Sequence, residues 1–174
     1  MKKLLILALA ACLVFSMAAC GTNTPNETAG STAAGASEPA VNEAFVFTYN
    51  GTKIQLHANM APILAALGEP KRYTESASCA FEGLDKTYYY GSFYIDTYPM
   101  GDQDYVFDFW FADDSVATAE GICIGSAKAQ VEAAYGADKY NGSNAYIVTE
   151  GDGRLTVILE EGVVTSIQYS VVLS

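Results

Sequence analysis

Acidic side chains cluster near the middle of the chain, where they have a clear capacity for chemistry. Five aspartates lie in one short stretch: Asp102, Asp104, Asp108, Asp113 and Asp114. Two facing carboxylates are the acid and base of many glycosidases. The spacing does not match an EF-hand loop, which needs oxygen ligands at alternate positions and a glycine at the sixth. We therefore interpret most of these aspartates as solvated turn and strand-end residues, and rank a carboxylate-based hydrolase last among the candidate functions.

Other catalytic signatures are absent from the sequence. His57 is the only histidine, and neither a cysteine nor a second histidine stands at metal-ligand spacing from it, which argues against a zinc site. The chain has no Gly-x-Ser-x-Gly elbow, phosphate loop or dinucleotide fingerprint. We predict a protein that is not an enzyme and holds no metal and no cofactor, with His57 a polar residue at a strand edge.

Aromatic residues dominate two strand-like segments, Phe93–Tyr98 and Tyr105–Phe111. Side chains alternate between the two faces of a strand. Alternation assigns these residues to the core: Phe93, Ile95, Thr97, Tyr105, Phe107, Phe109 and Phe111. The opposite face carries Val106 and five residues that form the candidate binding face: Tyr94, Asp96, Tyr98, Asp108 and Trp110. Tyrosine and tryptophan concentrate binding energy at interfaces and stack on cations. The competing interpretation is that these side chains cover a junction between two halves of the domain.

The first twenty residues indicate export. Two lysines precede an uncharged, mostly apolar run, and small residues stand directly before Cys20. This pattern resembles a bacterial lipoprotein signal peptide, which implies removal of residues 1–19 and a lipid on Cys20, with the protein anchored to the cell membrane and facing outside the cytoplasm. Residues 20–44 are then the lipidated cysteine and a flexible tether, because the segment has no aromatic residue and cannot bury enough apolar surface to fold.

The chain is strongly acidic. Its formal net charge is −11, and it becomes −13 when the two lysines of the leader are removed. This argues against a nucleic-acid partner and against adhesion to anionic lipid, and it leaves cationic ligands allowed. Apart from the leader and Cys20, the only cysteines are Cys79 and Cys123. In an oxidising compartment they would either form a disulfide or stay as buried free thiols.

Residues 45–174 are predicted to form one globular domain made of two repeats, at about 45–115 and 116–174. An offset of 68 aligns Ile54 with Ile122 and Gly68 with Gly136, and an offset of 58 aligns later strand residues. Each repeat is expected to be a short strand, a short amphipathic helix and an antiparallel meander. The predicted class is α+β, with helices on one face of the sheets and the other face partly open.

Local signals place several elements within these repeats. The dipeptide at residues 50–51 is Asn-Gly, which predicts a tight hairpin turn. Asn59 and Ser126 are the expected N-caps of the two helices. Gly68 and Gly136 stand where each helix should end. A strand is also expected near Cys79–Phe81.

The doubled pattern, with a helix ending in Leu-Gly-x-Pro at residues 67–70, resembles the beta-lactamase inhibitor protein fold. That fold is a tandem repeat of a helix plus a four-stranded antiparallel sheet with a concave binding face. The chain is also similar to the small lipoproteins of the barrel-assembly machinery, which hold one such unit. Residues 78–86, 97–99 and 113–125 resemble uncharacterised lipoproteins of Gram-positive, Clostridia-type gut anaerobes. These resemblances imply the fold and carry no known chemistry, and the inhibitor's contact residues do not transfer.

Together these observations predict a monomeric, surface-anchored lipoprotein that is a non-catalytic module for an extracellular protein or peptide, and that inhibits or scaffolds envelope enzymes. The alternative is a module for a small ligand, either a glycan or a cationic peptide, bound at the aromatic and acidic face.

Overall fold

Strands dominate the computed structural model, which describes residues 37–173. The predicted leader, Cys20 and the tether up to residue 36 lie outside the described residues. In chain order the elements are β1 (Val46–Tyr49), β2 (Thr52–Gln55), α1 (Met60–Leu67), β3 (Arg72–Ala77), β4 (Leu84–Tyr89), β5 (Phe93–Met100), β6 (Gln103–Phe111), α2 (Lys128–Tyr135), a 3-10 turn (Ala137–Lys139), β7 (Ala145–Glu150), β8 (Gly153–Glu160) and β9 (Val163–Val171).

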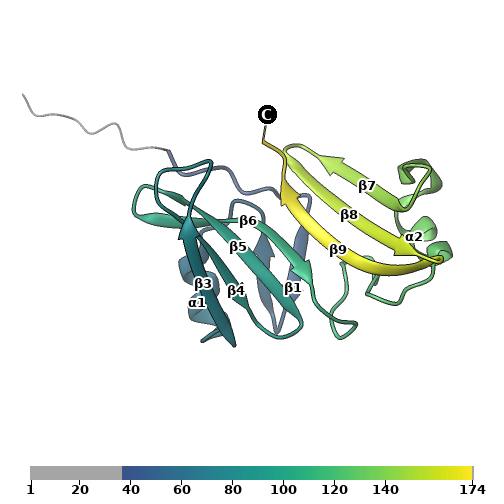
Figure 1. Ribbon diagram of the computed structural model, residues 1–174, viewed down its shortest axis with the longest axis horizontal. Helices are drawn as coiled ribbons and strands as arrows, with labels where there is room; N and C mark the ends of the chain where they lie inside the picture. The colour runs from purple at the N-terminus through teal and green to yellow at the C-terminus, as the bar shows by residue number, and fades with distance from the viewer. Residues whose placement is uncertain (1–36, 174) are drawn as a thin grey trace, which may run out of the picture. The chain divides into compact units, whose positions relative to one another are not determined.

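Seven strands form one antiparallel sheet in the order β3-β4-β5-β6-β9-β8-β7, while β1 pairs only with β2. Met60 and Ile63 of α1 and Val131 of α2 are buried in one core with the inward-facing strand residues. The predicted α+β class is therefore confirmed. In Figure 1, α1 lies behind β3 and β4, so the strands present their other face to the viewer. The two helices described are each eight residues long, and within residues 37–173 no helix is long and apolar enough to cross a membrane.

The hairpin predicted at residues 50–51 is confirmed. Both turn residues have positive φ, 48° at Asn50 and 82° at Gly51, which is the conformation of a type I′ turn. The hairpin presses the Phe47 ring onto the sheet, with its centroid 5.1 Å from that of Phe93 and 4.9 Å from that of Phe111. This aromatic cluster is part of the single core.

One of the two predicted helix caps is confirmed. Asn59 caps α1, and its side chain accepts a 2.9 Å hydrogen bond from the first turn. The prediction for Ser126 is wrong, because the N-cap of α2 is the next residue, Ala127. The Ala127 N–H donates to the Gln130 side chain at 2.8 Å, and the first helical N–H, that of Lys128, donates to the Gly162 carbonyl at 2.8 Å. The Ser126 hydroxyl instead accepts a 3.0 Å hydrogen bond from the Cys123 N–H.

The sheet edge at β3 was not predicted. The sequence suggested a strand at Cys79–Phe81, but that segment is a loop between β3 and β4. All six residues of β3 are exposed, so the strand carries no alternation of buried and exposed positions. Burial is the signal that periodicity detects, and a polar edge strand does not supply it.

A β-bulge in β6 changes which side chains reach the core. The β5–β6 register shifts so that Phe107 has no direct partner. Val106 is fully buried in the core, whereas Phe107 lines a cavity on the opposite face. Tyr105 packs against Tyr98 with ring centroids 5.9 Å apart. The predicted faces of Tyr105, Val106 and Phe107 are therefore wrong, because strict alternation assumes an unbroken ladder.

Backbone hydrogen bonds hold the strand at this bulge. The His57 N–H donates to the Val106 carbonyl at 2.8 Å, and the Val106 N–H donates to the Ala58 carbonyl at 2.9 Å. The second half has a similar arrangement at β9. There the Gly125 N–H donates to the Val164 carbonyl at 2.8 Å, and Val164 donates to Ser126 at 2.9 Å. The β8–β9 register also shifts there.

The folded part begins just before the expected boundary at Phe45. Asn42 is 8% exposed, and its side-chain amide donates to the Glu150 carbonyl and to the Asp152 carboxylate, each at 3.0 Å. Its backbone N–H donates to the Leu56 carbonyl at 3.0 Å. One asparagine thus joins the N-terminal segment to the first hairpin and to the β7–β8 turn.

We expect Asn42→Ala to lower the free energy of unfolding by about 1–3 kcal/mol, because it removes the buried side chain that donates to the Glu150 carbonyl and to the Asp152 carboxylate. Chemical denaturation followed by circular dichroism measures this. The control is Glu38→Ala, an exposed position in the same segment, expected to change stability by no more than about 0.5 kcal/mol. Equal effects of the two substitutions would contradict the anchoring role of Asn42.

Candidate functional site

The face of the sheet opposite the helices carries a row of stacked side chains, which we call the aromatic row: Arg72, Tyr89, Tyr94 and Trp110. The register places each directly opposite the next across β3, β4, β5 and β6. Tyr94 and Trp110 are stacked, with centroids 4.7 Å apart and an interplanar angle of 5°. Tyr89 and Tyr94 are stacked at 4.4 Å. The Arg72 guanidinium lies 5.1 Å from the centre of the Tyr89 ring, a cation–π distance.

A second row, on the same face, contains two carboxylates. Asp96 of β5 lies directly opposite Asp108 of β6, and Thr87 of β4 lies opposite Asp96. Directly opposed side chains have Cβ atoms about 4.5–5.5 Å apart, so the two carboxylates are immediate neighbours. Asp108 is only 9% exposed. Among the residues that the structure describes, the Asp108 carboxylate accepts one hydrogen bond, from the Gln168 amide at 3.3 Å.

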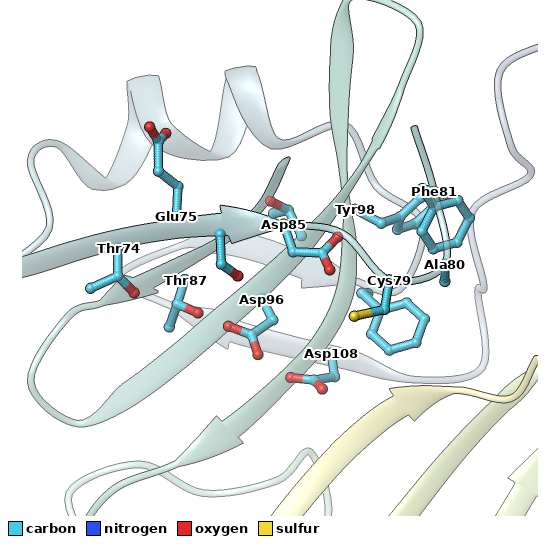
Figure 2. Close-up of a pocket in the computed structure, with 13 residues that line it drawn as sticks. Thr74, Glu75, Cys79, Ala80, Phe81, Asp85, Thr87, Asp96, Tyr98 and Asp108 are labelled. Carbon is cyan, nitrogen blue, oxygen red and sulfur yellow. The ribbon is translucent and has the colours of Figure 1, made fainter. Parts of the chain in front are cut away.

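These carboxylates lie in a cavity of about 460 Å³ between the sheet and the β3–β4 loop. The loop contributes Cys79, Ala80 and Phe81, and the bulge contributes Phe107. Figure 2 shows Asp96 and Asp108 next to each other with Asp85 above them. The cavity is therefore acidic on the sheet side and apolar on the loop side.

The electrostatics of this pair are unusual. Burial, and to a smaller extent the neighbouring Asp96 charge, raises the pKa of Asp108 to about 7, against the opposing effect of the Gln168 hydrogen bond. Burial also raises the pKa of Asp96, against a hydrogen bond from Thr87. The Oδ1 atoms of Asp96 and Asp108 are both buried and have no hydrogen-bond partner among the described residues. Buried acceptors of this kind are uncommon in folded proteins.

The five residues of the predicted binding face do not form a single patch. Tyr94 and Trp110 belong to the aromatic row, and Asp96 and Asp108 belong to the cavity. Tyr98 is 3% exposed and forms a cavity wall under Phe81, with ring centroids 4.6 Å apart. Burial raises its pKa to about 12.

Sequence reasoning missed the hydrogen-bond partners of Tyr98 and His57. The Tyr98 hydroxyl is 2.8 Å from His57 Nδ1, and His57 Nε2 is 3.0 Å from the Asp152 carboxylate. His57 has a φ of 63°, so its backbone leaves the strand where its ring reaches both groups. The hydrogen bond from Asn42 lowers the pKa of Asp152, and the charge of His57 acts in the same direction. Only tertiary structure brings together residues so far apart in sequence.

The remaining acidic and thiol residues have separate roles. Asp104 forms a 2.6 Å ion pair with Lys86. Asp113 accepts a 2.9 Å hydrogen bond from the Ser115 N–H at a turn. Cys79 is an exposed free thiol at the cavity, and Cys123 is a half-buried free thiol that contacts Ser126, so the two do not form a disulfide in this structure. Within residues 37–173, no group of three or more His, Cys, Asp or Glu side chains is arranged to hold a metal ion.

Comparisons with protein-family models, with curated proteins and with solved structures found no match to this chain. The function is therefore argued from the geometry of the aromatic row and the carboxylate pair.

We expect Asp108→Asn to stabilise the protein at neutral and higher pH. The folded carboxyl binds its proton up to a pH of about 7, whereas the unfolded group ionises near its ordinary value of about 3.9. The wild type therefore loses stability as the pH rises from about 4 to about 7, and asparagine does not titrate. The gain should be near zero at pH 4 and reach about 2–4 kcal/mol at pH 8.

Urea unfolding at a series of pH values measures this difference. The control is Asp102→Asn at the exposed β5–β6 turn, expected to change stability by less than about 0.5 kcal/mol at every pH. A difference between Asp108→Asn and the wild type that does not change with pH would contradict the assignment.

Proposed function

We propose that this protein is a lipid-anchored, non-catalytic module on the outside of the cell membrane, which binds an extracellular protein or peptide through the open face of its sheet. The observation that carries the proposal is the aromatic row, three stacked rings on a face that neither α1 nor α2 of the described residues covers. Rigid aromatic side chains lose little conformational entropy on binding and dominate the energetics of many interfaces. The proposed partner is neither nucleic acid nor anionic lipid, because the chain is acidic.

The junction between the two halves does not account for this row. Trp110 does lie at the junction, directly opposite Gln168 of β9. Tyr94 and Tyr89 lie on β5 and β4, one and two strands farther from β9. Covering the junction gives no reason to continue the stack onto these strands or to end it with a cation from Arg72.

A tandem repeat, as in the beta-lactamase inhibitor protein fold, is part of the proposal. The loop–strand pairing of Ala58 with Val106 and that of Ser126 with Val164 are related by the offsets of 68 and 58 found in the sequence. Each register shift leaves one residue unpaired, Phe107 in β6 and Thr165 in β9, again 58 positions apart. These correspondences support two similar halves.

We expect the double substitution Tyr94→Ala and Trp110→Ala to weaken partner binding at least tenfold, because both rings are half-buried on the open face. The mature chain serves as bait for envelope and culture-fluid proteins of the producing organism, and titration with the purified partner gives the dissociation constants. Tyr73→Ala is the control, since Tyr73 is 46% exposed but faces the other side, opposite the buried Tyr88. A partner lost equally from both variants, or from neither, would place the interface elsewhere.

Anchoring is tested separately at Cys20, which lies outside the described residues. We expect Cys20→Ala to abolish labelling by a palmitate analogue and to release the protein from the membrane fraction, because the thiol carries the lipid. Retention of label and membrane association by this variant would contradict lipoprotein processing. Cys12→Ala is the matched control, and it should leave both unchanged.

A small-ligand module for a glycan or a cationic peptide is the alternative within the binding class, since stacked rings beside carboxylates suit either.

A carboxylate-based hydrolase is the second candidate function, favoured by one observation. Asp108 has a raised pKa and lies beside Asp96. In glycosidases a carboxyl group with a raised pKa is the general acid and a neighbouring carboxylate is the base or nucleophile. Incubation with cell-wall glycans and assay of new reducing ends tests it. Release that disappears in Asp108→Asn would favour the hydrolase, and no release above the blank would favour the binding module.

A further inference from the structure

The carboxylate pair has a deficit of donors that the protein itself does not supply. Both Oδ1 atoms are buried and unpartnered, and the cavity lining contains no lysine, arginine or histidine. The nearby cations are engaged elsewhere. Lys86 pairs with Asp104 at 2.6 Å, and Arg72 lies over Tyr89. Two buried carboxylates without a counter-ion carry a desolvation cost that a bound cation would offset.

The fold does not require acidic residues at this position. In the second half, the pair directly opposed beside the β8–β9 register shift is Ile158 and Ser166. The corresponding pair beside the β5–β6 shift is Asp96 and Asp108. The register shift between β8 and β9 thus forms beside an apolar side chain, Ile158, and a small polar one, Ser166. The carboxylates are an addition to the bulge and not a condition for it.

The shape of the cavity limits which cations fit. Its floor offers the two carboxylates and the Thr87 hydroxyl, and its walls include the rings of Phe81 and Phe107. A group with several N–H donors on an apolar stem matches this arrangement, since the donors meet the carboxylates and the stem contacts the rings. A bare metal ion matches less well, because no third side-chain ligand from His, Cys, Asp or Glu is in place.

From this geometry we infer that the Asp96–Asp108 cavity binds one primary ammonium or guanidinium group, presented by a lysine or arginine side chain of the partner peptide. This inference rests on the proposed binding function and adds the chemical class that the open face selects. The aromatic row then contacts the residues flanking the cation. The carboxylates of Asp96 and Asp108, which line the cavity, become the acceptors for its N–H groups.

The probes are Nα-acetyl-lysine amide and Nα-acetyl-arginine amide, with their uncharged counterparts Nα-acetyl-norleucine amide and Nα-acetyl-citrulline amide. The protein is the lipidated full chain in detergent at low salt. Trp110 is the only tryptophan and lies beside both carboxylates in a shallow hollow of the same face, so its fluorescence reports binding. We expect each charged probe to bind at least tenfold more tightly than its uncharged counterpart.

Variants locate the site. Asp108→Asn and Asp96→Asn should each weaken binding of the charged probes at least tenfold, and the exposed Asp102→Asn should leave it within twofold. Because asparagine at position 108 is isosteric, near-ultraviolet circular dichroism checks that the fold is kept. Charged and uncharged probes that bind equally, or a Ca²⁺ titration that replaces the amine as the Asp108-dependent ligand, would overturn the inference.

The pH profile gives a second, independent readout. Binding of the charged probes should strengthen as the pH rises from 5 through about 7 and level off above, following ionisation of Asp108. The titratable groups that line the cavity with it are Asp96 and Tyr98 on β5, Asp85 on β4 and Cys79 in the β3–β4 loop, and the Gln168 amide on β9 donates to it. The Glu75 carboxylate on β3 instead accepts a 2.6 Å hydrogen bond from Tyr73 on the other face of the sheet. Equal binding at pH 5 and pH 8 would mean that Asp108 is not the receptor for the cation.

The two proposals fail in distinguishable ways. If the charged probes do not bind while partner capture still depends on Trp110, the cation site is wrong and the binding face stands. If the probes bind through Asp108 while no partner depends on the aromatic row, the cation site stands and the binding face is wrong.

Discussion

The structure depends on one backbone constraint in β6. This strand hydrogen-bonds to two different neighbours along its length, the β2–α1 loop at Val106 and β9 at Asp108–Trp110. A single regular strand cannot follow both, and the bulge at Phe107 absorbs the mismatch. Because of the bulge, two consecutive side chains, Phe107 and Asp108, line the same cavity. The core, the cavity and the continuity of the sheet all follow from this irregularity.

How far the sequence predicts the fold depends on how local each signal is. The hairpin at Asn50, the α1 cap at Asn59 and most strands rest on short-range chemistry, and the structure agrees with them. The bulge, by contrast, is imposed by a loop some fifty residues away from Val106 in sequence, so alternation alone assigns that residue to the wrong face. Tyr94 and Trp110 were assigned to one face correctly, because the ladder is regular where they pair.

The candidate site combines two kinds of surface with opposite energetic character. The stacked rings bury part of their area against one another and cost the fold little. The carboxylates are held where desolvation opposes their charge, which weakens the folded state at neutral pH. Local destabilisation of this kind is typical of residues retained for recognition and not for packing. Ser166, which lies beside the register shift in β9 as Asp108 does beside the one in β6, indicates that this backbone irregularity does not need a carboxylate.

The bonds of Asn42 have a mechanical consequence. With a lipid on Cys20, as proposed, drag on the domain is transmitted through the tether and enters the fold at Asn42. The load is then divided, because Asn42 bonds to Leu56 of the first half and to Glu150 and Asp152 of the second. Force applied at this point pulls on both halves together and does not peel the β1–β2 hairpin away first. The point where the proposed tether enters the fold is thus bonded to two parts of the chain that are about a hundred residues apart in sequence.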